Sequence, residues 1–262
     1  MEFLFALGSK GSDVGNFIYP YGITISKDNK IFVSDSLNHR IQIFHPDGSI
    51  LSTFGSHGQC DGQFDFPRGI TLHNDNKIFV CYSDWNHIIQ VFNSDGTFSA
   101  KFGSGQFKFP HGITISEDNK IFVSDWYNDR IQVFDTDYKF LYTFGSCGKC
   151  DLQFEGPKGI TISEDNKLYV CDSSNHRIQV FDTNGKFELE FKTSNPSDIT
   201  ISSNNKIYVS DNTNHKIHTY DLNGNLLDKF VFNIPRGMAI NSHNDLFVCD
   251  SSNNRIQVFK TL

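Results

Sequence analysis

Short apolar stretches separated by polar turns recur along the chain. Residues 22–25 precede the polar turn Ser-Lys-Asp-Asn-Lys, and residues 31–33 precede the polar segment Ser-Asp-Ser-Leu-Asn-His-Arg. A third apolar stretch, 41–44, leads to an Asp-Gly pair at 47–48, which favours a hairpin because glycine readily adopts positive φ. A fourth stretch ends at the Phe-Gly pair 54–55. This pattern predicts a unit of four short antiparallel strands.

The unit repeats along the whole chain, and each copy starts with a proline. The sequence Pro-x-Gly-Ile-Thr-Ile, or a variant of it, starts at Pro20, Pro67, Pro110, Pro157, Pro196 and Pro235. The successive spacings between these positions are 47, 43, 47, 39 and 39 residues. Four antiparallel strands in a repeat of about 40 residues are typical of a propeller blade. The chain is therefore predicted to be all-β, a closed six-bladed β-propeller with four antiparallel strands per blade.

The predicted propeller occupies residues 1–262 as one domain. Its blades are expected at about 22–55, 69–103, 112–145, 159–192, 198–231 and 237–260. The last unit has only three strands, whereas residues 2–7 form a lone strand before Gly8-Ser9. We therefore expect the N-terminal strand 2–7 to complete the last blade and close the ring, which leaves no open sheet edge there.

Aromatic residues recur at fixed positions of the repeat. In the second strand they are Phe32, Phe79, Phe122, Tyr169, Tyr208 and Phe247. In the third strand they are Phe44, Phe92, Phe134, Phe181, Tyr220 and Phe259. Equivalent positions form rings in a propeller, so these side chains are predicted to pack between neighbouring blades.

Composition narrows the function classes. The 262 residues carry a formal net charge of -7, which argues against a broad basic surface for nucleic acid. No apolar run approaches the roughly 18 residues of a membrane-spanning helix, so no membrane association is expected. The N-terminus lacks the basic start of a secretory signal, and the 6 cysteines do not form a disulfide framework. A cytoplasmic, monomeric protein is predicted.

A motif recurs from the end of the second strand to the third strand of each unit. It consists of Val-Ser-Asp or Val-Cys-Asp, then Asn-His-Arg or a variant, then Ile-Gln-Val-Phe or a variant. The central element lies at 38–40, 86–87, 128–130, 175–177, 214–216 and 253–255. This motif resembles the NHL repeat, and the resemblance covers nearly the whole chain. It implies a six-bladed propeller that serves as a protein-interaction or RNA-binding module, as in tripartite-motif proteins. The family that the motif resembles also includes sensor domains of bacterial kinases and a related lyase that contains a metal.

Acidic and basic positions of the motif occur together. Asp35, Asp125, Asp172, Asp211 and Asp250 follow the second strand, and Arg40, Arg130, Arg177, Lys216 and Arg255 open the third. A short loop joins the two positions, so each carboxylate is predicted to pair with its cation. In the second unit the two positions are Tyr82 and Ile88, with both charges lost. Joint loss favours a structural rather than a catalytic role.

The residue between Pro and Gly should line the central mouth on one face. Its occupants are Tyr21, Arg68, His111, Lys158, Ser197 and Arg236. Three cations and a histidine at equivalent positions predict a basic rim that binds a ligand. The alternative, that these are solvated loop residues with no ligand, stays open.

Aromatic residues mark the same face. Both tryptophans, Trp85 and Trp126, lie in loops between the second and third strands of adjacent blades, together with Tyr82 and Tyr127. Exposed aromatics beside Arg68 and His111 could anchor a protein or stack the bases of single-stranded RNA. Alternatively, they cover loops loosened by the altered second unit.

No catalytic constellation stands out from the repeat. Cys147 and Cys150 form a lone C-x-x-C, and His111 alone occupies the mouth, which is too few ligands for a metal cage. We therefore expect no catalytic residues, no metal and no cofactor. The prediction is a non-enzymatic binding module with a protein partner favoured over RNA. A lyase-like or hydrolase-like metalloenzyme is the least favoured alternative.

Overall fold

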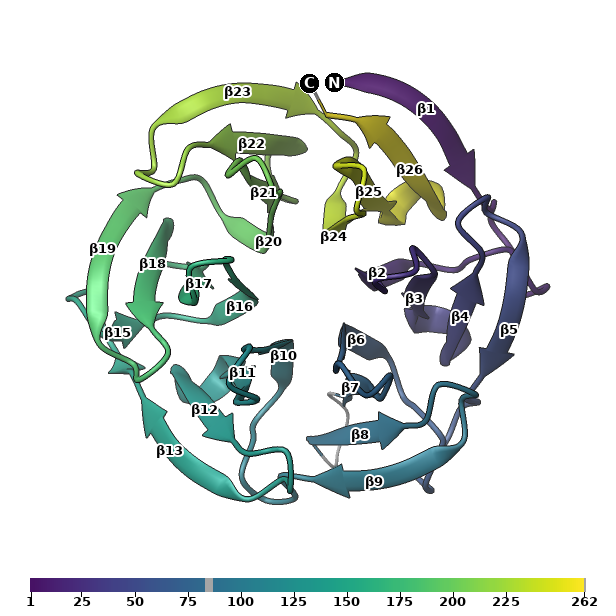
Figure 1. The fold of residues 1–262 in the computed structure, drawn as a ribbon, viewed down its shortest axis with the longest axis horizontal. Helices are drawn as coiled ribbons and strands as arrows, with labels where there is room; N and C mark the ends of the chain where they lie inside the picture. The colour runs from purple at the N-terminus through teal and green to yellow at the C-terminus, as the bar shows by residue number, and fades with distance from the viewer. Residues whose placement is uncertain (83–86, 262) are drawn as a thin grey trace.

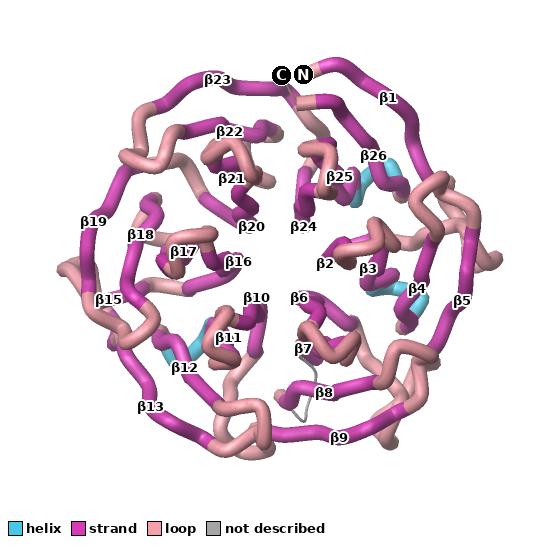
Figure 2. Tube along the Cα trace, in the orientation of Figure 1, coloured by secondary structure: helices cyan, strands magenta, loops and turns pink. Residues whose placement is uncertain are grey.

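The chain forms a ring of six four-stranded sheets around a central channel (Figure 1). The computed structural model describes residues 1–82 and 87–261. In five of the sheets the strands follow chain order from the channel to the rim, and in the sixth the first strand of the chain is outermost. Strands predominate in the described part of the chain, with short helical turns in three of its loops (Figure 2). The predicted all-β, six-bladed propeller is confirmed.

The strands of the first three blades succeed one another without a crossover. Blade 1 contains β2 (Pro20–Ile25), β3 (Ile31–Asp35), β4 (Arg40–Phe44) and β5 (Ile50–Phe54). Blade 2 contains β6 (Pro67–Leu72), β7 (Ile78–Tyr82), β8 (Ile88–Phe92) and β9 (Phe98–Phe102). Blade 3 contains β10 (Pro110–Ile115), β11 (Ile121–Asp125), β12 (Arg130–Phe134) and β13 (Phe140–Phe144).

The remaining blades follow the same plan. Blade 4 contains β16 (Pro157–Ile162), β17 (Lys167–Asp172), β18 (Arg177–Asp182) and β19 (Phe187–Lys192). Blade 5 contains β20 (Pro196–Ile201), β21 (Ile207–Asp211), β22 (Lys216–Tyr220) and β23 (Leu226–Val231). Blade 6 contains β24 (Pro235–Ile240), β25 (Asp245–Asp250), β26 (Arg255–Lys260) and β1 (Glu2–Leu7). A short parallel pair, β14 (Ser146–Cys147) and β15 (Gln153–Phe154), and the 3-10 turns η1 (Ser36–Asn38), η2 (Trp126–Asn128) and η3 (Ser251–Asn253) lie in loops.

The N-terminal strand closes the ring, as predicted. Strand β1 pairs antiparallel with β26 from Glu2 opposite Lys260 to Leu7 opposite Ile256. The two chain ends consequently lie side by side at the rim (Figure 1). The last blade therefore has its full set of four strands.

The apolar core lies between blades. One cluster joins Leu7 and Phe247 of blade 6 to Ile31 and Phe44 of blade 1, and five further clusters join the other neighbouring blades in the same way. The recurring aromatics of the second and third strands are buried, except Phe259, which is partly buried against its cluster. Because each blade buries its two faces against neighbours, the aromatic rings hold the disc together, as predicted.

A buried aspartate organises the loop between the second and third strands. In blade 1, the Asp35 carboxylate accepts hydrogen bonds from Arg40 Nε (2.8 Å) and from the backbone N–H of Ile18 (2.8 Å) in the preceding loop. The Asp–Arg pair recurs as Asp125–Arg130, Asp172–Arg177 and Asp250–Arg255, at 2.7–2.8 Å. These pairs confirm four of the five predicted pairings, and Asp35, Asp125 and Asp172 each also accept a hydrogen bond from a backbone N–H of the preceding loop. In blade 5, Asp211 instead accepts hydrogen bonds from Asn214.

The central residue of each Asn-His-Arg motif has a role that the sequence did not suggest. His176 Nδ1 accepts a hydrogen bond from the backbone N–H of Asn195 (3.4 Å), the residue before the next proline. Asn254 does the same for Tyr19 at 2.9 Å. The residues held in this way all have positive φ: Tyr19, Phe66, Phe109, Gly156, Asn195 and Ile234. The motif therefore fixes a strained backbone turn between consecutive blades.

Candidate binding face

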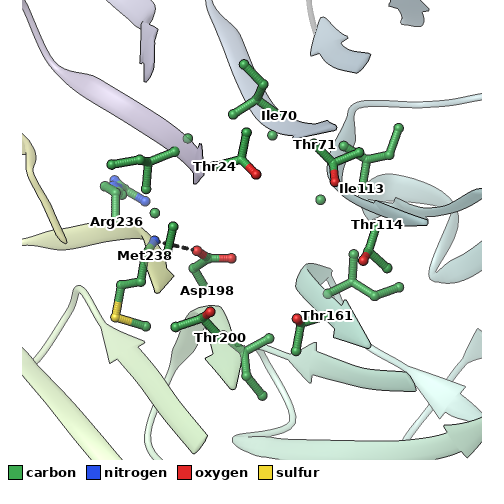
Figure 3. A pocket seen from close by; sticks show the side chains of 18 of the residues that line it. Thr24, Ile70, Thr71, Ile113, Thr114, Thr161, Asp198, Thr200, Arg236 and Met238 are labelled. Carbon is green, nitrogen blue, oxygen red and sulfur yellow. Dashed lines mark hydrogen bonds between the residues drawn. The ribbon is translucent and has the colours of Figure 1, made fainter. Parts of the chain in front are cut away.

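The innermost strands of all six blades surround a central channel. Close approach of these strands requires glycine after the x residue, since a Cβ on Gly22 would lie 2.1 Å from the carbonyl oxygen of Arg68 in the next blade. The channel contains a cavity of about 190 Å³ lined in part by threonine side chains (Figure 3). The labelled threonines are Thr24, Thr71, Thr114, Thr161 and Thr200.

Blade 5 places a carboxylate in this channel. Asp198 stands where five blades have glycine, and its Oδ2 accepts a hydrogen bond from the backbone N–H of Met238 in blade 6 (2.8 Å; Figure 3). Burial raises the pKa of Asp198 to about 7. This hydrogen bond joins the innermost strands of blades 5 and 6. In the other blades the glycine at this position allows the neighbouring strands to approach closely, whereas in blade 5 the Asp198 side chain links them.

The predicted mouth residues gather around Tyr21. The Tyr21 hydroxyl lies 2.7 Å from His111 Nε2 across the channel. The guanidinium carbons of Arg68 and Arg236 lie 5.3 Å and 5.0 Å from the Tyr21 ring centroid, within cation–π distance. Lys158 joins them through the Trp126 ring, at 5.9 Å. Tyr21, His111 and the three cations thus form one cluster.

Three cations in this cluster, Arg68, Lys158 and Arg236, form no ion pair with any other described residue. Burial lowers the pKa of His111 well below its usual value, and all three cations lower it further. Burial, followed by the charge of Arg236, also lowers the pKa of Lys158. The mouth is therefore a region of positive potential with a neutral histidine at its centre.

The predicted aromatic residues differ in position. Trp126 is partly buried beside His111, whereas Tyr127 is 55% exposed and has Lys108 Nζ 5.1 Å from its ring centroid. Trp85 lies outside the described residues. Tyr82 was expected to be exposed, and that prediction is wrong: its side chain is 1% exposed and packs against Ile88 in the core between blades 1 and 2. An apolar pair has replaced the buried ion pair at this position.

The same face carries residues that sequence reasoning missed. Tyr19, Leu37 and Phe66 line a shallow pocket of about 290 Å³ together with Tyr21, Ser36 and Arg68. Arg236 Nη2 donates a hydrogen bond to the Tyr19 hydroxyl (2.8 Å). Tyr19 and Phe66 each directly precede a repeat proline, so an aromatic residue at that position of the repeat could have indicated the pocket from the sequence.

No helix within residues 1–82 and 87–261 has the length and apolar character needed to cross a membrane.

Solved structures with the same ring arrangement include enzymes and a chain of a complex. A streptogramin B lyase aligns with a TM-score of 0.69 and 16% identity over 99% of both chains. A gluconolactonase from Xanthomonas campestris aligns with a TM-score of 0.74 and 13% identity over 98% of both chains. A chain of the nidogen/laminin complex aligns with a TM-score of 0.69 and 20% identity, covering 81% of this chain and 80% of that one. At such identities these likenesses establish the fold alone.

Sequence comparisons are more specific. "Protein brain tumor" of Drosophila melanogaster is 30% identical over 143 residues, which cover 54% of this chain and 14% of that protein. The model of the NHL repeat matches residues 17–44, 107–134, 154–181, 193–220 and 232–259. The matched segments omit the second unit, where Tyr82 and Ile88 replace the ion pair. More than half of the chain matches, and the chain therefore belongs to the NHL-repeat family.

Proposed function

We propose that this propeller is a non-catalytic binding module whose ligand is another macromolecule, held on the face that carries Tyr21, Arg68, His111, Lys158 and Arg236. The observation that carries the proposal is the group of three cations at the mouth that form no ion pair with a carboxylate of residues 1–82 or 87–261. Partly buried cations left without a counter-charge favour an anionic group brought by a partner.

A protein partner fits this face best. The shallow pocket lined by Tyr19, Leu37 and Phe66, called the Leu37–Phe66 pocket below, lies next to Arg68 and offers apolar and cationic contacts side by side. Leu37 and Phe66 are both exposed, as is Tyr127. A segment with a carboxylate beside an aromatic or aliphatic side chain would satisfy both kinds of contact. We therefore place an acidic protein segment across the mouth.

Single-stranded RNA is the second candidate, favoured by one arrangement. Lys158 lies over the Trp126 ring and Lys108 over the Tyr127 ring, so cations and aromatic faces alternate along the edge of the mouth. Bases stack on such rings while phosphates contact the cations. The net charge of -7 weighs against RNA, because it weakens non-specific electrostatic attraction to phosphates.

The proposal includes a monomeric protein in the cytoplasm. All six cysteines are free thiols, as expected for a reducing compartment.

Selection from a displayed library of random peptides tests the protein proposal. We expect enrichment of acidic peptides with an aromatic residue, and at least tenfold weaker binding by Arg68→Ala and Lys158→Ala. Arg68 is partly exposed and makes a cation–π contact with Tyr21, so its removal should leave the fold intact. The matched control is Lys139→Ala, an exposed lysine paired with Asp137 in a turn of blade 3. Equal binding by wild-type protein and Arg68→Ala would overturn the proposal.

Fluorescence anisotropy with a random pool of short single-stranded RNA distinguishes the second candidate. Saturable binding at physiological salt that Arg68→Ala and Tyr127→Ala abolish would replace the protein proposal with RNA recognition. Binding seen only at low salt would reflect non-specific attraction and leave the protein proposal in place.

A further inference from the structure

Two histidines and an aspartate meet at the junction of blades 1 and 2, outside the cluster around Tyr21. His39 Nδ1 lies 3.3 Å from Asp65 Oδ1, and His57 Nε2 lies 3.7 Å from the same oxygen. The ligand atoms of all three residues lie within 4.8 Å of one another. His39 belongs to the loop after η1, and the other two belong to the loop that joins the blades.

These separations fit a metal ion. Imidazole nitrogen and carboxylate oxygen bind Zn²⁺ at about 2.1 Å, so two ligands of a tetrahedral ion lie about 3.4 Å apart. The two measured separations from Asp65 Oδ1, 3.3 Å and 3.7 Å, bracket that value. All three ligand atoms lie within 4.8 Å of one another, so side-chain movements of about 1 Å would bring both histidines into range of an ion bound to Asp65.

The backbone holds the three residues in place. His57 follows Ser56, whose carbonyl oxygen accepts a hydrogen bond from Phe64 N–H (2.8 Å), and Gly58 N–H returns one to the Phe64 carbonyl (3.2 Å). Asp65 directly follows Phe64, which is fully buried. His39 N–H is bonded to the Ser36 carbonyl. Ligands on fixed backbone lose little freedom when they bind an ion.

The surroundings of His39 disfavour its charged form. Burial, and then the neighbouring His57, lower the pKa of His39. His39 Nδ1 also accepts a hydrogen bond from Phe66 N–H at 3.4 Å. Such a long bond is weak, and a metal ion can replace it as the partner of that nitrogen.

We propose that His39, His57 and Asp65 bind one divalent transition-metal ion, with Zn²⁺ as the preferred ion. Two imidazoles and one carboxylate are borderline ligands that suit Zn²⁺ better than Mg²⁺ or Ca²⁺. Three protein ligands leave a coordination position for water. Because Phe66 follows Asp65 and its ring lies 5.0 Å from that of His39, the ion would also steady one wall of the Leu37–Phe66 pocket.

The fold contains an internal comparison for this site. Residues equivalent to His39, His57 and Asp65 at the junction of blades 3 and 4 are Asp129, Cys147 and Glu155. There a hydrogen bond to Asp129 raises the pKa of the Cys147 thiol, which opposes formation of the thiolate that binds metal. The first junction is therefore expected to bind Zn²⁺ more tightly than the second.

Calorimetric titration with Zn²⁺ and visible absorption with Co²⁺ test the proposal. We expect one Zn²⁺ per chain, a Co²⁺ spectrum of low coordination number, and weaker binding at acidic pH, because protons compete with the metal ion for the imidazole nitrogens. His57→Ala and Asp65→Asn should each weaken binding at least tenfold. His57 is 68% exposed, so its replacement should not affect folding.

His39→Asn separates metal binding from folding. Asn254 holds the equivalent backbone N–H in blade 6, so asparagine at position 39 should keep the hydrogen bond to Phe66 while losing the metal. The control is His243→Ala, an exposed histidine in a turn of blade 6. Failure of the wild-type protein to bind Zn²⁺, or equal binding by wild type, His57→Ala and Asp65→Asn, would overturn the proposal.

Discussion

Blades 2 and 4 each hold the loop that precedes them, but they do so by different contacts. In blade 4, Asp172 is fully buried and accepts hydrogen bonds from Arg177 Nε (2.7 Å) and from the backbone N–H of Glu155 (2.8 Å). In blade 2, Tyr82 and Ile88 pair across the strands and pack in the core between blades. The Tyr82 hydroxyl still reaches the preceding loop, where it donates to the Gly58 carbonyl (3.3 Å).

The comparison shows that the repeat needs a link between the blade and its preceding loop, and that this link need not be ionic. A buried ion pair requires several partners to offset its desolvation, whereas an apolar pair gains from burial alone. Blade 4 should therefore be sensitive to the loss of any one partner. Blade 2 should tolerate the loss of the contact between the Tyr82 hydroxyl and Gly58.

The largest effect is expected from Asp172→Ala. The change removes the acceptor for Arg177, Gln179 and the Glu155 backbone, and it leaves a buried guanidinium without its main partner. We expect the free energy of unfolding to fall by about 3–5 kcal/mol, measured by urea denaturation. Asp137→Ala, in an exposed turn, is the control and should change stability by less than about 0.5 kcal/mol. A similar loss in both variants would refute the structural role of Asp172.

Placing the tyrosine–isoleucine pair of blade 2 at the equivalent positions of blade 4 tests directly whether the two kinds of link can replace each other. Asp172→Tyr and Arg177→Ile should each destabilise blade 4 because the remaining member of the pair loses its buried partner. The double variant should be less destabilised than the sum of the two, with a coupling of about 1–3 kcal/mol in a double-mutant cycle. Additive effects would mean that the two positions do not act as a pair.

A smaller loss of stability, equal in the two blades, is expected when the equivalent histidine of either blade is replaced. His87 and His176 each accept a hydrogen bond from the residue before the next proline. His87→Ala and His176→Ala should each cost about 1 kcal/mol in thermal or urea denaturation. His176→Asn should recover most of the loss, because Asn254 makes this bond in blade 6. An asparagine variant as unstable as the alanine variant would contradict this role.

The smallest effect belongs to Tyr82→Phe. It removes the hydroxyl bond to Gly58, and we expect a loss of about 0.5 kcal/mol in the same denaturation measurement. A loss comparable to that of Asp172→Ala would show that the tyrosine hydroxyl, rather than the apolar contact with Ile88, holds blade 2 together.

The architecture could be predicted from the sequence because every unit repeats the same local signals. The Asp47-Gly48 hairpin, the spacing of the repeat prolines and the lone strand 2–7 together specify four strands per blade and closure by the N-terminus. The Asp–Arg pairing was also predictable, since Tyr82 and Ile88 lose both charges together.

The site was predictable only in part. Equivalence of the x positions brings Tyr21, Arg68 and Arg236 to one mouth, because the repeat sets their place in the ring. The burial of Tyr82 could not be foreseen, since a tyrosine in a loop motif is read as exposed until its packing against Ile88 is known. The approach of His39 to Asp65 depends on how two loops fold against each other, which the spacing along the chain does not encode.

The pairing of β1 with β26 has a mechanical consequence. Glu2 lies opposite Lys260, so both chain ends leave from the same end of this two-strand ladder. Tension applied between the ends would load the hydrogen bonds one pair at a time, as in a zipper, instead of shearing all of them together. Closure that protects the ring against thermal opening therefore provides little resistance to a pulling force, and the seam between β1 and β26 would be the first part of the disc to yield.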